Sequence, residues 1–198
     1  MNTRQIRRAA QRPGPQRSGP VLALAAALAL ALGGCASAGH GAAGLGAAPT
    51  PGAAATTDGP SDAAHLVCTG TAENEITGAL GIRTTEPLAP TWTDHVYACR
   101  YAFADGSMRL SVKDLPDDAG TTAWFDSLHT AATGSTALSG MGDGAFQEPN
   151  GTVVVRKDHA VLVVDVAALP ATVGKPVRPR ATAARTVAQT VLICWKEY

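Results

Sequence analysis

The chain has 198 residues, and its 16 Lys and Arg balance its 16 Asp and Glu, so the formal net charge is zero. Five of the arginines lie within the first 20 residues, which contain no acidic residue. Beyond residue 34 the sequence is therefore mildly acidic, with 11 basic residues against 16 acidic ones and a net charge of −5. The remaining cations form no compact cluster, apart from a diffuse set at Lys175, Arg178, Arg180 and Arg185. Nucleic-acid binding needs a basic face, so the composition argues against a nucleic-acid partner and against a polybasic membrane patch.

Residues 1–34 have the organisation of an export signal. The arginine-rich start is followed by a run of 12 apolar residues at positions 21–32. A helix that crosses the roughly 30 Å hydrocarbon core of a bilayer needs about 20 apolar residues, so this run is too short to remain as a span. A basic segment followed by a short apolar run predicts a secretory signal that is removed from the mature protein.

The apolar run ends in Leu32-Gly33-Gly34-Cys35, which resembles a bacterial lipobox. The resemblance implies cleavage before Cys35 and attachment of a diacylglycerol and a further acyl chain such as palmitate. The protein would then be held by lipid at the outer face of the cytoplasmic membrane. The alternative is an ordinary signal peptide cleaved near Ala36-Ser37-Ala38, in which the cysteine is incidental.

A lipid-anchored tether is predicted at residues 35–60. Positions 36–60 contain 9 Ala, 6 Gly and 3 Pro, with Leu45 as the single large apolar residue. Such a segment cannot bury enough apolar surface to offset its ordering entropy. Random-coil scaling gives it an end-to-end distance of about 25–30 Å.

Residues 61–198 are predicted to form one globular domain, large enough to bury about two-thirds of its surface. A short helix is expected around residues 71–80, with Thr71 as N-cap and Gly81 as its end. From His95 the pattern alternates with period two, which predicts a strand, and Asp105-Gly106 supplies a hairpin turn to a returning strand. One face of the first strand would carry Tyr97, Cys99, Tyr101 and Phe103.

The second half of the domain continues with a helix that begins at Asp117 or Asp118 and contains Trp124. A glycine-rich turn at 140–146 delivers Phe146 to the core, and valine-rich segments at 153–155 and 161–166 form a second hairpin. Pro179 can open a last helix, whose apolar face is predicted from the spacing of Ala184, Val187, Val191 and Cys194. This order predicts an α+β fold, an antiparallel sheet with helices packed mainly on one face.

Three cysteines remain besides Cys35, and outside the cytoplasm thiols tend to oxidise. We predict a Cys68–Cys99 disulfide, which ties the segment before the first helix to the first long strand. The rival pairing is Cys68–Cys194, since connectivity cannot be deduced from sequence. A metal site is not expected, because the sequence has no Cys-x-x-Cys and no closely spaced histidine pair.

No known catalytic motif occurs, so no catalytic residue and no cofactor is predicted. Asp165 stands out as an acid within an apolar strand, where it would face solvent or lie inside a cleft. The aromatic residues of the sheet would be core or would line a groove for a small ligand. The candidate groove residues are Tyr97, Tyr101, Phe103, Trp124 and Asp165.

Taken together, the motifs resemble the small actinobacterial envelope lipoproteins of a domain-of-unknown-function family. The shared features are the lipobox, the Ala/Gly/Pro tether, Cys68 before a helix that ends in Leu80-Gly81, Cys99 in the next strand, and the turn at 140–146. The resemblance covers about residues 65–195 and implies an envelope lipoprotein without an established activity.

Two classes of function remain. The first is a non-catalytic module that binds a small envelope ligand or a protein partner at the membrane. The alternative is an envelope-acting hydrolase with an active site dispersed in the sequence. The lack of nucleophile and metal motifs favours the first class. Within it, an open aromatic groove would favour a ligand, whereas a filled core with an exposed apolar patch would favour a protein partner.

Overall fold

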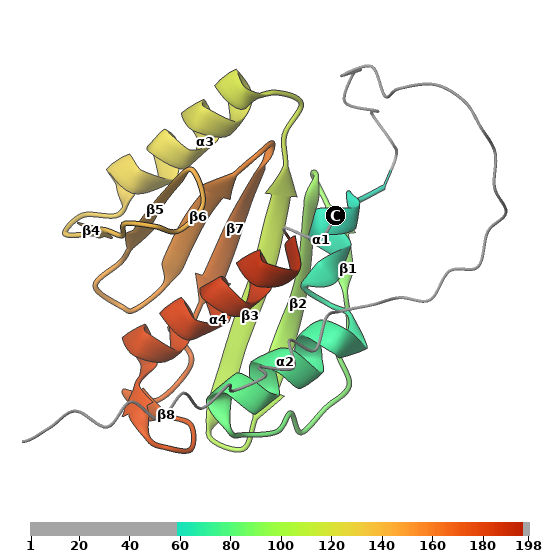
Figure 1. Ribbon diagram of the computed structural model, residues 1–198, viewed down its shortest axis with the longest axis vertical. Coiled ribbons are helices and arrows are strands. Elements are labelled where there is room, and N and C mark those ends of the chain that lie inside the picture. The colour runs from blue at the N-terminus through green and yellow to red at the C-terminus, as the bar shows by residue number, and fades with distance from the viewer. Residues whose placement is uncertain (1–58, 196–198) are drawn as a thin grey trace, which may run out of the picture. The chain divides into compact units, whose positions relative to one another are not determined.

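Seven strands form one antiparallel sheet in the order β1-β2-β3-β7-β6-β5-β4 (Figure 1). The computed structural model describes residues 59–195, so the predicted signal, Cys35 and most of the predicted tether lie outside the described residues. The strands of the sheet are β1 (Thr91–Thr93), β2 (Val96–Phe103), β3 (Gly106–Asp114), β4 (Thr136–Ala137), β5 (Gly144–Gln147), β6 (Val153–Lys157) and β7 (Ala160–Asp165). The helices are α1 (Asp62–Leu66), α2 (Gly70–Leu80), α3 (Asp118–Ala131) and α4 (Arg180–Trp195), and β8 (Thr172–Val173) pairs with β9 (Arg178–Pro179) in a separate hairpin.

The two faces of the sheet are covered by different helices. Apolar side chains of α1, α2 and α4 pack with alternate residues of β2, β3, β6 and β7 to form the main core. A smaller cluster on the opposite face joins α3 to β5, β6 and β7 around Phe146, Val154 and Val161. Three of the four helices therefore lie on one face, which confirms the predicted α+β fold. The VLVV run of β7 is apolar on both sides because helices cover both of its faces.

The β2–β3 hairpin forms with the predicted alternation and turn. Tyr97 pairs with Val112 and Cys99 with Leu110 across the two strands, and these side chains enter the main core. The sequence analysis missed β1, because it read His95 as the first residue of a strand. Asp94 and His95 instead have φ of 51° and 59°, so they form the two-residue turn between β1 and β2. Asp and His tolerate this left-handed backbone better than most residues.

Helix α2 begins earlier than predicted. Its N-cap is Thr69, whose hydroxyl accepts a hydrogen bond from the Ala72 amide, and Thr71 lies inside the first turn. The predicted end is confirmed, because Gly81 has φ of 67° and its amide bonds to the last turn. A Cβ at Gly81 would lie 2.1 Å from the Lys175 carbonyl oxygen, and the Lys175 amide donates to Leu80 O. The absence of a side chain at Gly81 thus allows the β8–β9 hairpin to pack against the end of α2.

The predicted starts of α3 and α4 are confirmed, whereas the short helix α1 was not predicted. Asp117 caps α3 by accepting from the Gly120 amide, and α4 begins at Arg180, directly after Pro179. The predicted apolar face of α4 is confirmed, because Ala184, Val187, Val191 and Cys194 are all buried. Phe146 is buried in the smaller cluster on the α3 side, as predicted. Within residues 59–195, no helix is long and apolar enough to cross a membrane.

Ser61, which precedes α1, is fixed to one end of the sheet. Asp114, the last residue of β3, accepts hydrogen bonds from the Ser61 amide at 2.8 Å and from the Ser61 hydroxyl at 2.7 Å. The same hydroxyl oxygen accepts from the Ala64 amide and caps α1. The chain therefore enters the domain at the Asp114 end of β3, which places the attachment point of the predicted tether.

A disulfide and a buried tyrosine hold the α1–α2 junction against β2. Cys68 and Cys99 are bonded with their Cα atoms 5.8 Å apart, so the predicted pairing is confirmed over the Cys68–Cys194 alternative. The buried Tyr101 hydroxyl donates to the Val67 carbonyl at 2.7 Å. Burial, with a smaller contribution from the Glu73 carboxylate, raises the pKa of Tyr101 well above its usual value of about 10.

We expect Tyr101→Phe to lower the free energy of unfolding by about 1–3 kcal/mol at neutral pH, because the buried Val67 carbonyl loses its donor. The unfolded chain ionises this tyrosine near pH 10, whereas the folded chain holds its proton to higher pH. The contribution of Tyr101 is thus complete below pH 10 and is lost above it, by about 1.4 kcal/mol per pH unit. Urea denaturation from pH 8 to 11 should show the advantage of the native protein over the variant shrinking above pH 10. A constant difference in unfolding free energy between the native protein and the variant over this range would contradict the raised pKa of Tyr101 in the folded protein.

Candidate functional site

The five residues predicted to line a ligand groove are not brought together. Tyr97, Tyr101 and Phe103 are 9, 0 and 8% exposed and pack in the main core beneath α1, α2 and α4. Trp124 lies on α3. Asp165, at the end of β7, is the cross-strand partner of Arg109. Because Met108 and Leu110 on either side of Arg109 point into the main core, Arg109 and Asp165 point to the opposite, α3 side of the sheet. The aromatic stripe of β2 is therefore core, and no groove contains all five side chains.

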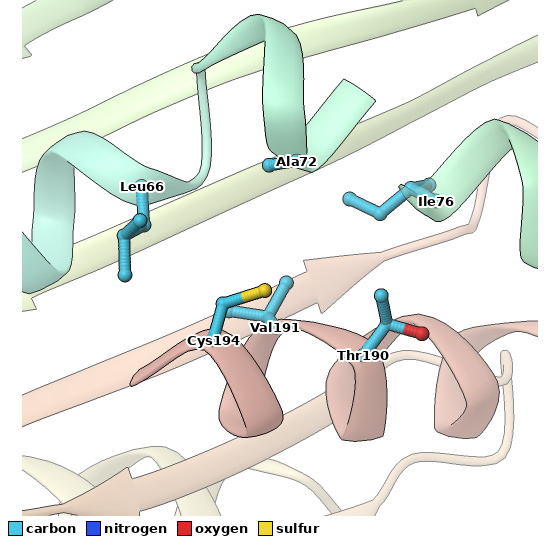
Figure 2. A pocket seen from close by; sticks show the side chains of 6 residues that line it. All are labelled: Leu66, Ala72, Ile76, Thr190, Val191 and Cys194. Atoms are coloured by element: carbon cyan, nitrogen blue, oxygen red, sulfur yellow. The ribbon is translucent and has the colours of Figure 1, made fainter. Parts of the chain in front are cut away.

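A small cavity lies between α1, α2 and α4. Figure 2 shows side chains from these helices directed toward one another around it, and the lining is Leu66, Ala72, Ile76, Thr190, Val191 and Cys194. Its volume is about 10 Å³, which is about the smallest space that holds one water molecule. This cavity is a minor packing defect and has no room for an organic ligand.

The α3 side of β1, β2 and β3 forms a candidate binding surface. Helix α3 packs on β5, β6 and β7, so the side chains of the first three strands on this side extend beyond the helix. Most are polar and at least partly exposed, in contrast to the opposite face of the same strands. We call this surface the uncovered face and define it by Thr91, Thr93, Val96, Arg100, Ser107, Arg109, Ser111 and Lys113. Ala98 and Ala102 lie on the same side of β2, but they are buried between their neighbours.

Two exposed arginines stand directly opposite each other in the middle of the uncovered face. Arg100 of β2 and Arg109 of β3 are cross-strand partners, and directly opposite side chains in a sheet have Cβ atoms about 5 Å apart. Like charges in this arrangement destabilise a sheet. Carboxylates flank the pair, since Glu86 lies 3.4 Å from Arg100 and Asp165 is the partner of Arg109 on β7. The face thus bears a row of four charges with two cations at its centre.

A tryptophan borders the uncovered face on the α3 side. Trp124 is 39% exposed, and the Lys113 ammonium lies 4.9 Å from the centre of its ring. The same ammonium donates to the Asp94 carbonyl at 2.8 Å, so Lys113 connects α3 to the β1–β2 turn. Lys113 and Arg109 are four residues apart on β3, about 13 Å at the usual rise of a strand. Trp124 and the arginine pair therefore lie close enough together for one protein interface to cover both.

Asp165 is half-buried at the margin of this surface. Its carboxylate accepts hydrogen bonds from the Thr152 hydroxyl at 3.3 Å and from the Ala167 amide at 2.9 Å. These contacts, together with Arg109 across the strand pair, favour the solvent-facing alternative for this residue over a closed cleft.

The histidines and the glycine-rich turn do not build a reaction centre in the described part of the chain. His159 lies 3.2 Å from Asp118, but their side chains are 52 and 84% exposed. Gly142 permits a close approach to β6, where an added Cβ would lie 2.4 Å from the Arg156 carbonyl oxygen, so the turn serves packing. Among residues 59–195, no group of three or more His, Cys, Asp or Glu side chains could hold a metal ion.

Sequence reasoning missed Arg100, Arg109 and Lys113 as a group. The signal was present, because β3 alternates apolar and polar residues from Ser107 to Lys113 and the Asp105-Gly106 turn fixes its register with β2. That register places Arg100 opposite Arg109. What the sequence lacked was the position of α3, which leaves this part of the sheet open.

The chain matches no known family model, no curated protein and no solved structure. The resemblance to small actinobacterial envelope lipoproteins consequently stays a prediction, and the functional argument depends on the chain's own residues.

Proposed function

We propose that this protein is an envelope lipoprotein, anchored through a diacylglycerol on Cys35, whose domain is a non-catalytic docking module outside the cytoplasm. Its partner would be a protein that presents acidic side chains to the uncovered face. The anchor is supported by the lipobox and the export signal, and the docking role is supported by the geometry of the sheet. The resemblance to envelope lipoproteins supports the anchor and leaves the activity open.

The observation that carries the docking role is the opposed pair Arg100–Arg109 on a part of the sheet that none of the helices within residues 59–195 covers. Two like charges are held side by side, an arrangement that by itself costs stability, while the flanking carboxylates of Glu86 and Asp165 lie on the outer sides of the pair. A partner carboxylate between them would convert this repulsion into two charge-assisted hydrogen bonds, which are among the stronger polar contacts in proteins. Trp124 adds a second anchor, because tryptophan and arginine are the residue types most enriched among interface hot spots.

The core favours a protein partner over a small ligand. Aromatic side chains that could have lined a groove are packed beneath helices, and the cavity between the helices holds about one water molecule. An exposed face with arginines and a tryptophan suits a broad protein contact better than an enclosed molecule.

The docking role can be tested by photo-crosslinking in intact cells. A photoreactive amino acid at Thr93, exposed on the uncovered face, should give one discrete protein adduct. The matched control position is Glu75, exposed on α2 in the opposite layer, which should give none. Adding Arg100→Glu or Arg109→Glu should reduce the Thr93 adduct at least tenfold, because truncation or reversal of a hot spot costs about 2 kcal/mol or more.

Charge reversal at these exposed arginines should leave the melting temperature close to that of the native protein, so a lost adduct reports on binding. Equal adducts from Thr93 and Glu75, or an adduct that survives both reversals, would contradict the proposed surface. A small molecule that co-purifies with the domain and is released on denaturation would favour the ligand-binding alternative. Hydrolysis of an envelope component would favour the enzyme alternative.

A further inference from the structure

Three of the four cations that are diffuse near the end of the sequence, Lys175, Arg178 and Arg180, lie at one end of the folded domain together with Arg83. Lys175 is joined to the end of α2 through its amide bond to Leu80, and Arg83 follows two residues beyond Gly81. Arg180, the first residue of α4, donates to the Leu169 carbonyl at 2.8 Å, so the start of α4 lies beside the segment that leads into the β8–β9 hairpin. We call this surface the basic end and define it by Arg83, Lys175, Arg178 and Arg180. Within residues 59–195, none of the four is in an ion pair.

An exposed apolar side chain, that of Val177, belongs to the same end of the domain. Val177 lies between β8 and β9 and is 72% exposed, the highest value among the exposed large apolar residues of the described chain. Lys175 precedes it by two residues and Arg178 follows it directly, so cations flank it along the chain. An apolar residue surrounded by cations has the chemistry of a bilayer interface, where acyl chains lie beneath anionic headgroups.

The opposite end of the domain is acidic. The β1–β2 turn, the end of β3, the start of α3 and the β6–β7 turn meet there, because Asp114 N bonds to His95 O and Leu115 N bonds to His159 O. The carboxylates at this end are those of Asp62, Asp94, Asp114, Asp117, Asp118, Asp143 and Asp158. In Figure 1, α1 marks this end and the β8 label marks the basic end. Neither end carries a single sign, because Asp105 and Glu148 lie in turns at the basic end, and Lys113 and Lys157 lie at the acidic end. Cations remain in excess at the basic end and carboxylates at the acidic end, so the domain would turn its basic end toward an anionic surface.

The length of the predicted tether suits this orientation. Ser61 enters at the acidic end, and the ends are separated by about the length of β3, which is about 26 Å at the usual rise per residue. If the basic end contacts the bilayer, the chain between the membrane-bound Cys35 and Ser61 must span about 26 Å to reach the acidic end. For residues 36–60, the composition predicts a root-mean-square length of about 25–30 Å by random-coil scaling, which is a sequence-based prediction. An intramolecular contact is most favoured when linker length matches the span.

We infer that the basic end, together with the exposed Val177, is a second membrane contact that docks the domain on the anionic bilayer bearing its lipid. The match of tether length rests on the proposed Cys35 anchor, whereas the charge and the exposed valine do not. Docking would turn the acidic end away from the bilayer and restrict the rotation of the uncovered face. The occupant is a bilayer with phosphate-bearing anionic lipids.

The contact can be tested without the anchor. Mature chain 35–198 carrying Cys35→Ser should sediment with vesicles of phosphatidylcholine and phosphatidylglycerol at low salt, and remain in solution with phosphatidylcholine alone. Lys175→Ala should weaken binding about fivefold, the effect of about 1 kcal/mol per cation near an anionic surface. Val177→Asp should weaken it further, since it places an anion at the interface. The matched control is Lys157→Ala, a cation at the acidic end, which should bind like the parent chain.

Several outcomes would overturn the inference. These are a lack of preference for anionic vesicles, an equal loss in Lys157→Ala, or unchanged binding in both basic-end variants. Competition by inorganic phosphate at constant ionic strength would assign the site to a free anion instead of a bilayer. Far-ultraviolet circular dichroism of each variant controls for folding. The assay contains neither a protein partner nor a lipid on Cys35, so its failure would leave the proposed anchor and docking face standing.

Discussion

Replacing Cys35 by serine is expected to move the protein from the membrane fraction to the soluble fraction of cells. Each buried methylene of an acyl chain contributes about 0.8 kcal/mol to membrane binding, and two or more chains give stable anchoring. The serine variant cannot form the thioether to diacylglycerol, so the effect should be nearly complete. Membranes should be washed at high salt before the fractions are compared, because salt screens any electrostatic contact of the basic end.

Cys194→Ala is the matched control for this experiment, since it removes a cysteine outside the predicted lipobox. It should stay in the membrane fraction at the level of the native protein. Native protein that is released in mature form would instead support cleavage at the Ala36-Ser37-Ala38 site. Retention of Cys35→Ser after the salt wash would contradict the lipid anchor.

Loss of the Cys68–Cys99 disulfide should give the largest change in stability. The bond closes a loop with a sequence separation of 31 residues, for which the loop-entropy model gives about 3–4 kcal/mol. We expect Cys68→Ala to lower the melting temperature by roughly 10 °C for a domain of this size. Thermal unfolding followed by circular dichroism, with and without reductant, measures the effect.

The reductant response separates the two cysteine pairings. Native protein and Cys194→Ala should both lose stability when reduced, because Cys194 is not part of the observed disulfide. Cys68→Ala should show no further loss on reduction. A Cys194→Ala variant that no longer responds to reductant would contradict the observed pairing and favour Cys68–Cys194.

Local chemistry in the sequence predicted much of the fold. The β2–β3 hairpin followed from its alternation and from Asp105-Gly106, because a strand has period two and the turn sets its register. The end of α2 and the start of α3 followed from Gly81 and Asp117, which satisfy helix-terminal backbone groups. Short elements such as β1 were missed, because three residues provide too little alternation to stand out from a loop.

The candidate surfaces could not be predicted in the same way. Alternation showed that Tyr97, Tyr101 and Phe103 share a face, but it is equally satisfied by a buried core and by an open groove. The choice depends on which side α1, α2 and α4 cover, and that is a property of long-range packing. The same packing places α3 over β5–β7 and leaves Arg100 and Arg109 open.

The sequence alone thus determined what is encoded by neighbouring residues. This includes the type of most helices and strands, because backbone preferences are local. The address at the membrane is a prediction from the lipobox at Cys35, which is also a local signal. Tertiary structure decided the partner of Cys68, the face on which each aromatic residue lies, and the gathering of Arg83 with Lys175 and Arg180. These outcomes join residues that are far apart in the chain, and only the packing of the helices on the sheet brings them together.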